Sequence, residues 1–215
     1  MKKLALAAIL SSFTLPAFAD ATANAKLSTL GFGVEAAIPL TQSVDARIGY
    51  NGYKYDFDKT STSNGVPTNY SGDLKLSNAQ VLADWHPWGG SFRLSAGVIF
   101  NNNKFEMTAQ PSGTTVNIGG TPYTIGAGEA VNATVDFNKT APYLGVGWGR
   151  TPKNSGLSFT SDIGVMFQGK PKGSVTTNIA GVNQNDVNRA NTDLNDALDN
   201  FRFYPVISFG IGYTF

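Results

Sequence analysis

The last eight residues, 208–215, constrain the fold more than any other part of the chain. Phe209, Ile211, Tyr213 and Phe215 alternate with small or polar residues, so one face of a terminal strand is apolar and the other is not. In a water-soluble sheet, such an edge strand would be a bare template for aggregation. The pattern suits a strand that closes a barrel and turns its apolar face toward lipid, because a closed barrel leaves no unpaired edge.

The first 19 residues have the pattern of a secretory signal peptide. Two lysines give a positively charged start, residues 4–10 are apolar, and Ala17-Phe18-Ala19 provides a small-x-small cleavage site. The apolar run is much shorter than the ~20 residues that span a bilayer, which argues against a membrane anchor. We therefore expect residues 1–19 to be a signal peptide and residues 20–215 to form one outer-membrane β-barrel domain.

The composition is consistent with an exported barrel and argues against several other classes of protein. The chain contains no cysteine, so neither a disulfide framework nor a thiolate metal site is expected. Hydrophobic residues make up 41% of the chain and charged residues only 14%, and the apolar residues are spread in alternation, as they are in transmembrane barrels. A formal net charge of +1 gives no reason to expect a nucleic-acid partner. No metal and no cofactor is predicted.

Alternating segments predict an all-β fold, an eight-stranded antiparallel up-and-down transmembrane β-barrel. A barrel chain that starts and ends on the periplasmic side needs an even number of strands, which is why the short first segment is included. The predicted strands are Ala23–Leu30, Phe32–Leu40, Ser43–Asp58, Gly72–Pro87, Ser91–Gln110, Val131–Arg150, Gly156–Asn178 and Arg202–Phe215.

The predicted connections alternate between short turns and long loops, with the short side periplasmic. The long loops are residues 59–71, 111–130 and 179–201. The first is rich in Ser, Thr and Asn and is predicted to be a mobile loop, and the second contains a small hairpin around Gly119-Gly120. In the third, apolar residues recur at helical spacing over residues 186–201, which predicts a short amphipathic helix in the last extracellular loop. Its four aspartates are predicted to lie largely on the solvated side.

Three tryptophans give an independent indication of where the membrane surface lies. Trp85, Trp88 and Trp148 all fall within a few residues of a short turn. This spacing predicts an aromatic girdle at the periplasmic membrane interface. The alternative is that they belong to the core of a soluble sandwich.

Charged residues on the inward face gather at one height of the predicted barrel. Glu35, Arg47, Asp84 and Arg93 lie on four successive strands in the order acid, base, acid, base, and Asp162 lies across the barrel at a similar height. Neighbouring strands are about 4.8 Å apart, so each charge can reach partners on both sides. We predict an interior ion-pair network that fills the lower half of the lumen, because an unpaired charge there would be costly.

His86 is the only histidine, and Asp84 shares its strand face. This pairing is used in acid–histidine catalysis. However, His86 lies at the short-turn end before Pro87, no serine stands beside it in a hydrolase-like motif, and Asp84 has arginine neighbours. A single histidine without cysteine is also a poor transition-metal site. The chain is therefore predicted to have no catalytic residue and not to be an enzyme.

The leader, the alternating strands and the Phe215 terminus resemble small Gram-negative outer-membrane barrels of the opacity-protein and outer-membrane-protein-A transmembrane-domain type. The segments Leu82–Gly90, Phe92–Gly97 and Asp162–Gly169 resemble a set of uncharacterised proteobacterial barrels. The aromatic last residue, with apolar residues at every second position before it, resembles their C-terminal insertion signal. The resemblance implies the cell outer membrane as location, and outer-membrane lipid and the barrel-assembly machinery as partners.

Two functions from different classes remain open. The first is a non-enzymatic barrel with a structural or surface-interaction role and a charge-filled lumen. The second is a narrow channel for small or hydrophobic solutes, admitted past the loop helix. A lipid-modifying enzyme is a distant third. A plugged lumen favours the first function, and a continuous or laterally open internal path favours the second.

Overall fold

The computed structural model describes residues 21–63, 66–111, 113, 115–150 and 155–215. The predicted signal peptide at residues 1–19 lies outside the described residues, as does residue 20. Among the described residues the chain forms thirteen strands and one helix. No helix in this part of the chain is both long and apolar enough to cross a bilayer.

The elements follow one another in this order: β1 (Thr22–Ser28), β2 (Gly31–Pro39), β3 (Val44–Ser63), β4 (Val66–Trp85), β5 (Phe92–Asn101), β6 (Lys104–Pro111), β7 (Thr115–Ile118), β8 (Thr121–Thr124), β9 (Val131–Asp136), β10 (Thr140–Trp148), β11 (Gly156–Phe167), β12 (Lys172–Thr177), α1 (Gln184–Leu198) and β13 (Phe203–Thr214).

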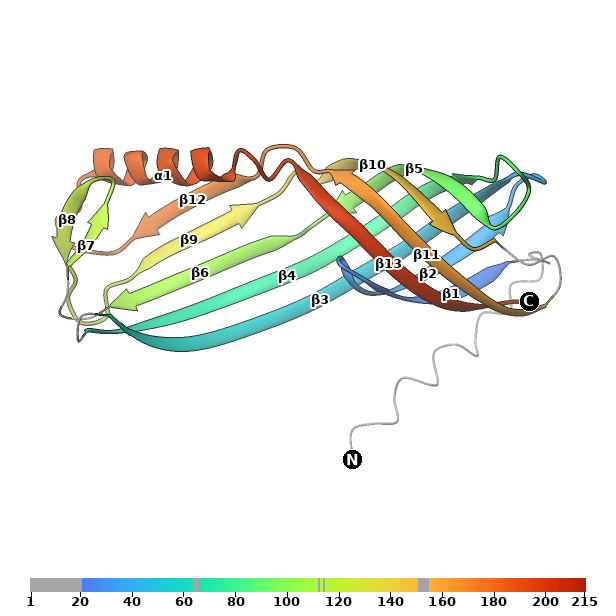
Figure 1. Cartoon of the computed structure of the whole chain (residues 1–215). Coiled ribbons are helices and arrows are strands. Elements are labelled where there is room, and N and C mark those ends of the chain that lie inside the picture. The colour runs from blue at the N-terminus through green and yellow to red at the C-terminus, as the bar shows by residue number, and fades with distance from the viewer. Residues whose placement is uncertain (1–20, 64–65, 112, 114, 151–154) are drawn as a thin grey trace, which may run out of the picture.

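Eleven strands form one antiparallel sheet in the order β12-β9-β6-β4-β3-β2-β1-β13-β11-β10-β5, and β7 and β8 form a separate hairpin (Figure 1). β4 pairs with β3 along its whole length, with β6 through Thr68–Lys75, and with β5 through Asn78–Trp85. The β4–β5 pairing joins the two ends of the series β4-β3-β2-β1-β13-β11-β10-β5, which we call the eight-strand run. β6, β9 and β12, together with the adjoining halves of β3 and β4, form the extension.

The sheet of eleven strands corrects the prediction of eight. Three predicted strands are each divided in two: Ser91–Gln110 into β5 and β6, Val131–Arg150 into β9 and β10, and Gly156–Asn178 into β11 and β12. The other five predicted strands each correspond to one strand, β1, β2, β3, β4 and β13. In each case one of the two resulting strands stays in the eight-strand run. The other, β6, β9 or β12, joins the extension.

Local hydrogen bonds and backbone conformations explain two of the breaks. Between β5 and β6, the Asn103 side chain replaces a strand neighbour, since its Oδ1 accepts from the Ser77 backbone N–H at 3.0 Å and from the Asn78 amide at 2.8 Å. Between β11 and β12, Gly169 has a φ of 68°, and Pro171 has no N–H to donate to a strand ladder.

β3 and β4 form a hairpin with 20 residues in each strand. The sequence predicted a mobile loop at Lys59–Ser71. The prediction of a loop is wrong for residues 59–63 and 66–71, because the strand register continues through these described residues. Its polar residues instead suit a solvated pair of strands. Thr60, for example, donates to the Asn69 side chain across the hairpin at 2.8 Å.

The predicted helix is present as α1, and it lies along β12 at the free edge of the extension (Figure 1). Asn195 donates to the Gly173 carbonyl at 2.9 Å and accepts from its N–H at 3.0 Å. Asn191 makes the same two bonds to Val175, at 3.2 and 2.7 Å. Four helical residues rise about 6 Å and two strand residues about 6.6 Å. The two asparagines therefore match the spacing of the edge groups, and α1 takes the place of a further strand.

A cluster of buried apolar side chains lies on the enclosed side of the eight-strand run, the side that carries Arg47. Its members are Leu30, Leu82, Ile99, Ala141, Tyr143, Met166 and Val206, with Tyr204 packed against it. Gly145 and Gly164 make room for Tyr143, because a Cβ at either position would collide with the tyrosine hydroxyl.

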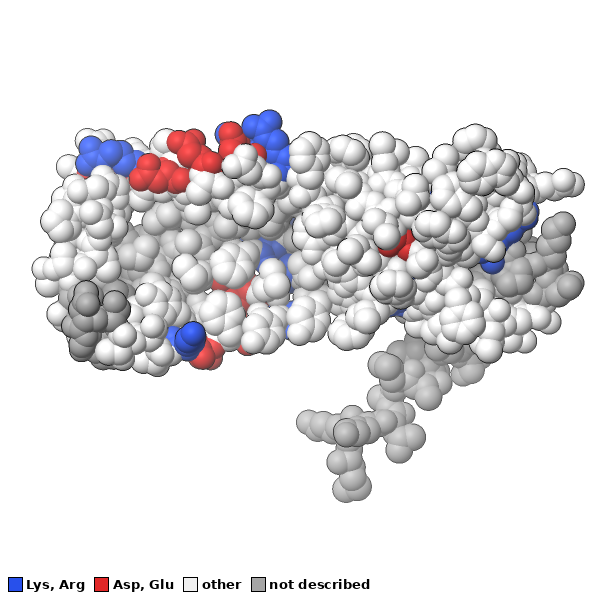
Figure 2. All heavy atoms as spheres, in the orientation of Figure 1, with Lys and Arg blue, Asp and Glu red and all other residues white. Residues whose placement is uncertain are grey.

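The opposite face of the eight-strand run is apolar and exposed. Figure 2 shows this half of the molecule almost free of charged side chains, while charges gather over α1. Phe159 and Leu157 are 70% and 68% exposed. Other exposed apolar residues of the run are Leu27, Phe32, Val34, Ile48, Val81, Leu94, Phe100, Leu144, Ile163, Ile207, Phe209 and Ile211.

The edge role of α1 predicts the behaviour of an Asn191→Ala/Asn195→Ala variant. It removes four side-chain hydrogen bonds to β12, each worth roughly 1 kcal/mol. We expect faster amide hydrogen exchange in β12 and a greater tendency to aggregate through its edge. Asn188→Ala is the matched control, since Asn188 is exposed on the same helix. Equal exchange rates in the two variants would contradict the edge role.

Candidate functional site

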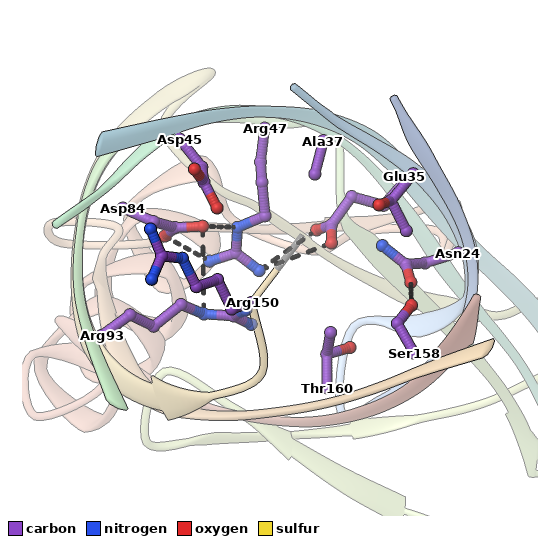
Figure 3. A pocket seen from close by; sticks show the side chains of 11 residues that line it. Asn24, Glu35, Ala37, Asp45, Arg47, Asp84, Arg93, Arg150, Ser158 and Thr160 are labelled. Carbon is purple, nitrogen blue, oxygen red and sulfur yellow. Dashed lines mark hydrogen bonds and ion pairs between the residues drawn. The ribbon is translucent and has the colours of Figure 1, made fainter. Parts of the chain in front are cut away.

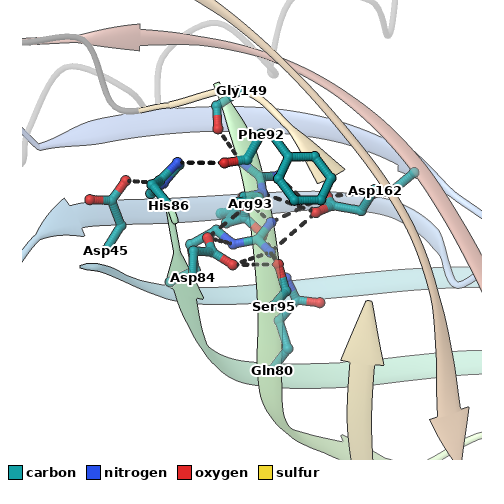
Figure 4. A network of polar contacts seen from close by, with 12 residues as sticks. Asp45, Gln80, Asp84, His86, Phe92, Arg93, Ser95, Gly149 and Asp162 are labelled. Carbon is teal, nitrogen blue, oxygen red and sulfur yellow. Dashed lines mark hydrogen bonds and ion pairs between the residues drawn. The ribbon is translucent and has the colours of Figure 1, made fainter. Parts of the chain in front are cut away.

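The five charged residues predicted for the interior all lie buried on the enclosed side of the eight-strand run. They come from five strands, and the structure brings all of them into one network (Figures 3 and 4). They are Glu35 on β2, Arg47 on β3, Asp84 on β4, Arg93 on β5 and Asp162 on β11.

Arg47 lies at the centre of this network and contacts all three acids. Its Nη2 donates to Asp84 Oδ1 at 2.9 Å, and its Nη1 lies 3.2 Å from Asp162 Oδ2 and 3.4 Å from Glu35 Oε2. The side chain is 2% exposed. A guanidinium suits this position because its planar fork offers five donors in fixed directions, so one base can join several carboxylates.

Arg93 links the network to the short-turn end of the sheet. Its Nη2 lies 2.8 Å from Asp162 Oδ1, and its Nη1 donates to the Gly149 carbonyl at 2.8 Å (Figure 4). Asp84 lies 3.8 Å from the Arg93 Nε. Asp162 is therefore held between Arg47 and Arg93, which explains how a carboxylate can stay ionised so far from solvent.

Sequence reasoning missed one charged member of the network. Lys26 on β1 places its Nζ 2.8 Å from Glu35 Oε2 and 4.0 Å from Asp162 Oδ2. Period two along Ala23–Leu30 already puts Lys26 on the inward face, so the signal was present in the sequence. With Lys26 included, three bases face three acids, and the charges of the network balance.

Neutral side chains use up the remaining hydrogen-bonding capacity of the three acids. Gln80 donates to Glu35 at 2.7 Å, Ser95 to Asp84 at 2.6 Å, and Ser208 to Asp162 at 3.1 Å. These residues alternate with outward-facing ones on β4, β5 and β13. Their small or amide side chains fit between the longer charged ones.

Little free space remains beside the network. A cavity of about 10 Å³ lies there, which is about the space that one water molecule needs. Figure 3 looks into it along the strands. It is lined by Thr22, Asn24, Glu35, Ala37, Asp45, Arg47, Asp84, Arg93, Arg150, Ser158 and Thr160.

His86 pairs with Asp45 rather than with Asp84, its neighbour on the same strand face. Its Nε2 lies 3.2 Å from Asp45 Oδ2, and its Nδ1 lies 3.0 and 3.1 Å from the carbonyl oxygens of Gly90 and Phe92 (Figure 4). The ring thus ties the turn between β4 and β5 to β3. This arrangement uses both ring nitrogens and leaves neither directed at an open space.

The three tryptophans lie on the outer surface at the short-turn end. Trp85 and Trp148 are each about half exposed, and Trp88 is 78% exposed. Sequence reasoning missed Phe92, whose ring centroid lies 5.1 Å from that of Trp88 and 5.5 Å from that of Trp148. Phe92 therefore joins two of the tryptophans into one aromatic cluster.

The last strand has the alternation that its sequence predicted. Phe209, Ile211, Tyr213 and Phe215 are all exposed on one face, between 45% and 64%. β13 pairs with β1 on one side and with β11 on the other. Its backbone is thus paired on both sides, while its apolar side chains face outward.

A separate group of contacts holds the start of α1 to the β7–β8 hairpin. The Tyr123 hydroxyl donates to the Asp186 carboxylate, which also pairs with Arg189. The hydrogen bond from Tyr123 lowers the pKa of Asp186 below its ordinary value of 3.8. Asp186 is buried, so it is an exception to the prediction that the aspartates lie largely on the solvated side of the helix.

The central position of Arg47 predicts a large effect of Arg47→Met on stability. Removing the guanidinium leaves three buried acids without their shared partner, which costs about 3–5 kcal/mol. Equilibrium urea unfolding in lipid vesicles measures the loss. Lys54→Met is the control, because Lys54 is 60% exposed and ion pairs at the surface contribute little to stability. Similar losses in the two variants would contradict a central role.

The contact between Asp186 and Tyr123 predicts an acid-dependent loosening of α1. The pKa of Asp186 is lower in the folded than in the unfolded state, so the contact stabilises above pH 3.8 and is lost as the pH falls below it. Hydrogen exchange in the first turn of α1 should therefore rise below about pH 3.8. Asp186→Asn should abolish this pH step, and the exposed Asp193→Asn should keep it. A pH step that persists in Asp186→Asn would disprove the assignment.

The comparisons with known proteins bear on the fold alone. No protein-family model matches the chain, and no curated protein matches it. The resemblance to the opacity-protein type thus stays a prediction. Among solved structures, the chain is similar to Acinetobacter baumannii CarO2, with a TM-score of 0.61, 23% identity, and coverage of 91% of this chain and 98% of that one. It is also similar to Acinetobacter baumannii CarO, with a TM-score of 0.56, 21% identity, and coverage of 90% and 97%.

Proposed function

We propose that this protein is an outer-membrane β-barrel with a structural or surface-interaction role and a lumen filled by ion pairs. The eight-strand run is its transmembrane barrel. Two features support this reading: the β4–β5 pairing that joins the ends of the run, and the exposed apolar side chains on its outer face. An apolar outer band and a polar interior are the properties of barrels that cross membranes.

The observation that carries the proposal is the filled interior. Barrels of eight strands have interiors just wide enough for side chains to fill, and here six charged side chains from six strands meet in one neutral network. The cavity of about 10 Å³ beside them is far smaller than a solute. The network therefore closes the lumen at the height of Arg47.

The proposed orientation places the short turns in the periplasm and the extension outside the cell. Trp85, Trp88 and Trp148 then lie at the periplasmic interface, where aromatic residues are enriched. The strands of the extension rise beyond the membrane and end at the β7–β8 hairpin and α1. This part is the surface through which the protein would contact its surroundings.

The remaining assignments follow the same proposal. Outer-membrane lipid is the partner of the apolar band, and β13 is the segment that the barrel-assembly machinery would recognise. No catalytic activity is proposed, because His86 and Asp45 contact each other at the short-turn end of the sheet. Neither a cofactor nor a nucleic-acid partner is proposed.

The alternative of a narrow channel for small or hydrophobic solutes has one observation in its favour. The enclosed side of the eight-strand run carries an apolar cluster around Leu82, Ile99 and Tyr143. These side chains are buried, and the ion pairs beside them would oppose the passage of an apolar solute.

Planar-bilayer conductance tests the proposal. The folded wild-type protein should give no steady ohmic openings, because the network fills the lumen. An Arg47→Ala/Glu35→Ala variant removes one base and one acid, which keeps the charge balance, and should conduct more. Lys54→Ala/Asp56→Ala, an exposed pair outside the network, should behave as the wild type. Steady openings in the wild type that Arg47→Ala alters would argue for a channel.

A further inference from the structure

The strand register of the extension sets side chains in straight rows across β3, β4, β6, β9 and β12. Two neighbouring rows, which we call the apolar strip, contain only aromatic, aliphatic and glycine residues. The first row is Tyr55, Leu74, Phe105, Val135 and Gly173, and the second is Phe57, Gly72, Met107, Ala133 and Val175.

The apolar strip lies on the same side of the sheet as the ion-pair network. Tyr55 and Phe57 are an even number of residues from Arg47 on β3, so they share its face. The ring of Phe57 lies over Gly72, where a Cβ would collide with it. Tyr55 stacks beside Phe57 with ring centroids 6.2 Å apart. Figure 1 shows this side of the extension facing the viewer, between α1 and β3.

The opposite face of the same strands is strongly polar. Its rows are Lys54, Lys75, Lys104, Asp136 and Lys172, and then Asp56, Asp73, Glu106, Thr134 and Ser174. Ion pairs join the two rows, for example Lys54 with Asp56 and with Asp73, each at 3.1 Å. The extension is therefore an amphipathic sheet whose polar face suits water.

An amphipathic sheet ordinarily covers its apolar face with a second layer, and the apolar strip is not covered in this way. Tyr55 is 52% exposed, and Phe57, Phe105 and Met107 are partly exposed. Val135 is buried, but no residue of the strip belongs to either buried apolar cluster of the described residues. Leu194 and Leu198 of α1 cover the β12 end, over Gly173.

The size of the apolar strip favours a small molecule over a protein. Five strands span about 19 Å and the two rows lie about 7 Å apart, which gives a surface of roughly 200–300 Å² once side-chain width is included. A stable protein interface needs about 800 Å² on each partner. A second copy of the chain or a partner protein would therefore gain too little from this surface.

The apolar strip is bounded at both ends along the strands. Toward the barrel, the next pair on this face is Tyr53 and Leu76. A row of fully buried asparagines, Asn51, Asn78 and Asn101, follows it, and the ion-pair network lies beyond them. At the far end, Ile118 and Ile125 pack with Ile179 and close the extension. An apolar molecule on the strip would thus be stopped by amides and charges before it entered the lumen.

We propose that the apolar strip binds an uncharged apolar small molecule, with an aromatic or aliphatic body, without passing it through the lumen. The proposal rests on the proposed function only for the location of the extension outside the membrane. Aromatic side chains at the strip supply large apolar contacts, and the flexible Met107 side chain adapts to different shapes. The absence of charge from both rows excludes ionic ligands as the preferred class.

Binding is tested with the full-length mature protein in lipid nanodiscs and the uncharged fluorophore N-phenyl-1-naphthylamine. We expect saturable binding above that of empty nanodiscs. Met107→Asp should weaken it about tenfold or more, because the carboxylate would lose solvation under the ligand. Thr108→Asp is the matched control, since Thr108 is the next residue on β6 and lies on the polar face; it should leave binding unchanged. A heat-dependent mobility shift on SDS gels verifies that each variant is folded.

Two outcomes would overturn this proposal: no saturable binding above empty nanodiscs, or equal weakening by the two variants. The location of the extension is tested separately. The chain has no cysteine, so Ser174→Cys, at an exposed position of the polar face, provides a single label site. Labelling of intact cells by a membrane-impermeant maleimide supports the proposed function. If the maleimide labels this cysteine in lysed cells but not in intact cells, the proposed function is contradicted, whatever the nanodisc result.

Discussion

The buried guanidinium of Arg47 is the interaction on which the rest of the structure depends. A cation taken out of water loses several kcal/mol of solvation, which only well-placed opposite charges can offset. Here the offset comes from three acids on three different strands. Those acids would repel one another without it, and Lys26 and Arg93 complete their neutralisation. Because its members come from six strands, the network forms only when the sheet has curled.

Backbone N–H and C=O groups also need hydrogen-bond partners, and this need shapes strands β4 and β12. β4 meets it by pairing with β5 over one half and with β6 over the other. β12 has no further strand beside it, and the amides of Asn191 and Asn195 supply the missing donors and acceptors. α1 therefore covers the β12 edge of the extension, while the half of β3 beyond Gly52 pairs with β4 alone. The apolar strip of the extension is the surface for which we propose an apolar ligand.

Much of the site could be predicted from the sequence because period two assigns each side chain to a face. Glu35, Arg47 and Asp162 could be placed together from alternation and from their distance to the turns. The partner of His86 could not be predicted from the sequence, because both Asp84 and Asp45 are near it. The direction of the His86 ring is set by its contacts with the turn between β4 and β5. The break near Asn103 was also missed, since hydrogen bonds with another strand end the ladder there. The break near Gly169 and Pro171 was missed as well, although both residues are local signals for the end of a strand.

By itself, the sequence determined which face of each strand is apolar, where the short turns fall and that a helix precedes the last strand, because these follow from local periodicity and residue type. Only the tertiary structure decided which strands pair, how β4 is shared between β5 and β6, and that residues 59–63 and 66–71 pair as strands instead of forming a loop. The physical reason is that strand pairing is made by backbone groups, which are the same in every residue. The choice among partners far apart in the chain is therefore settled by how all the strands fit together.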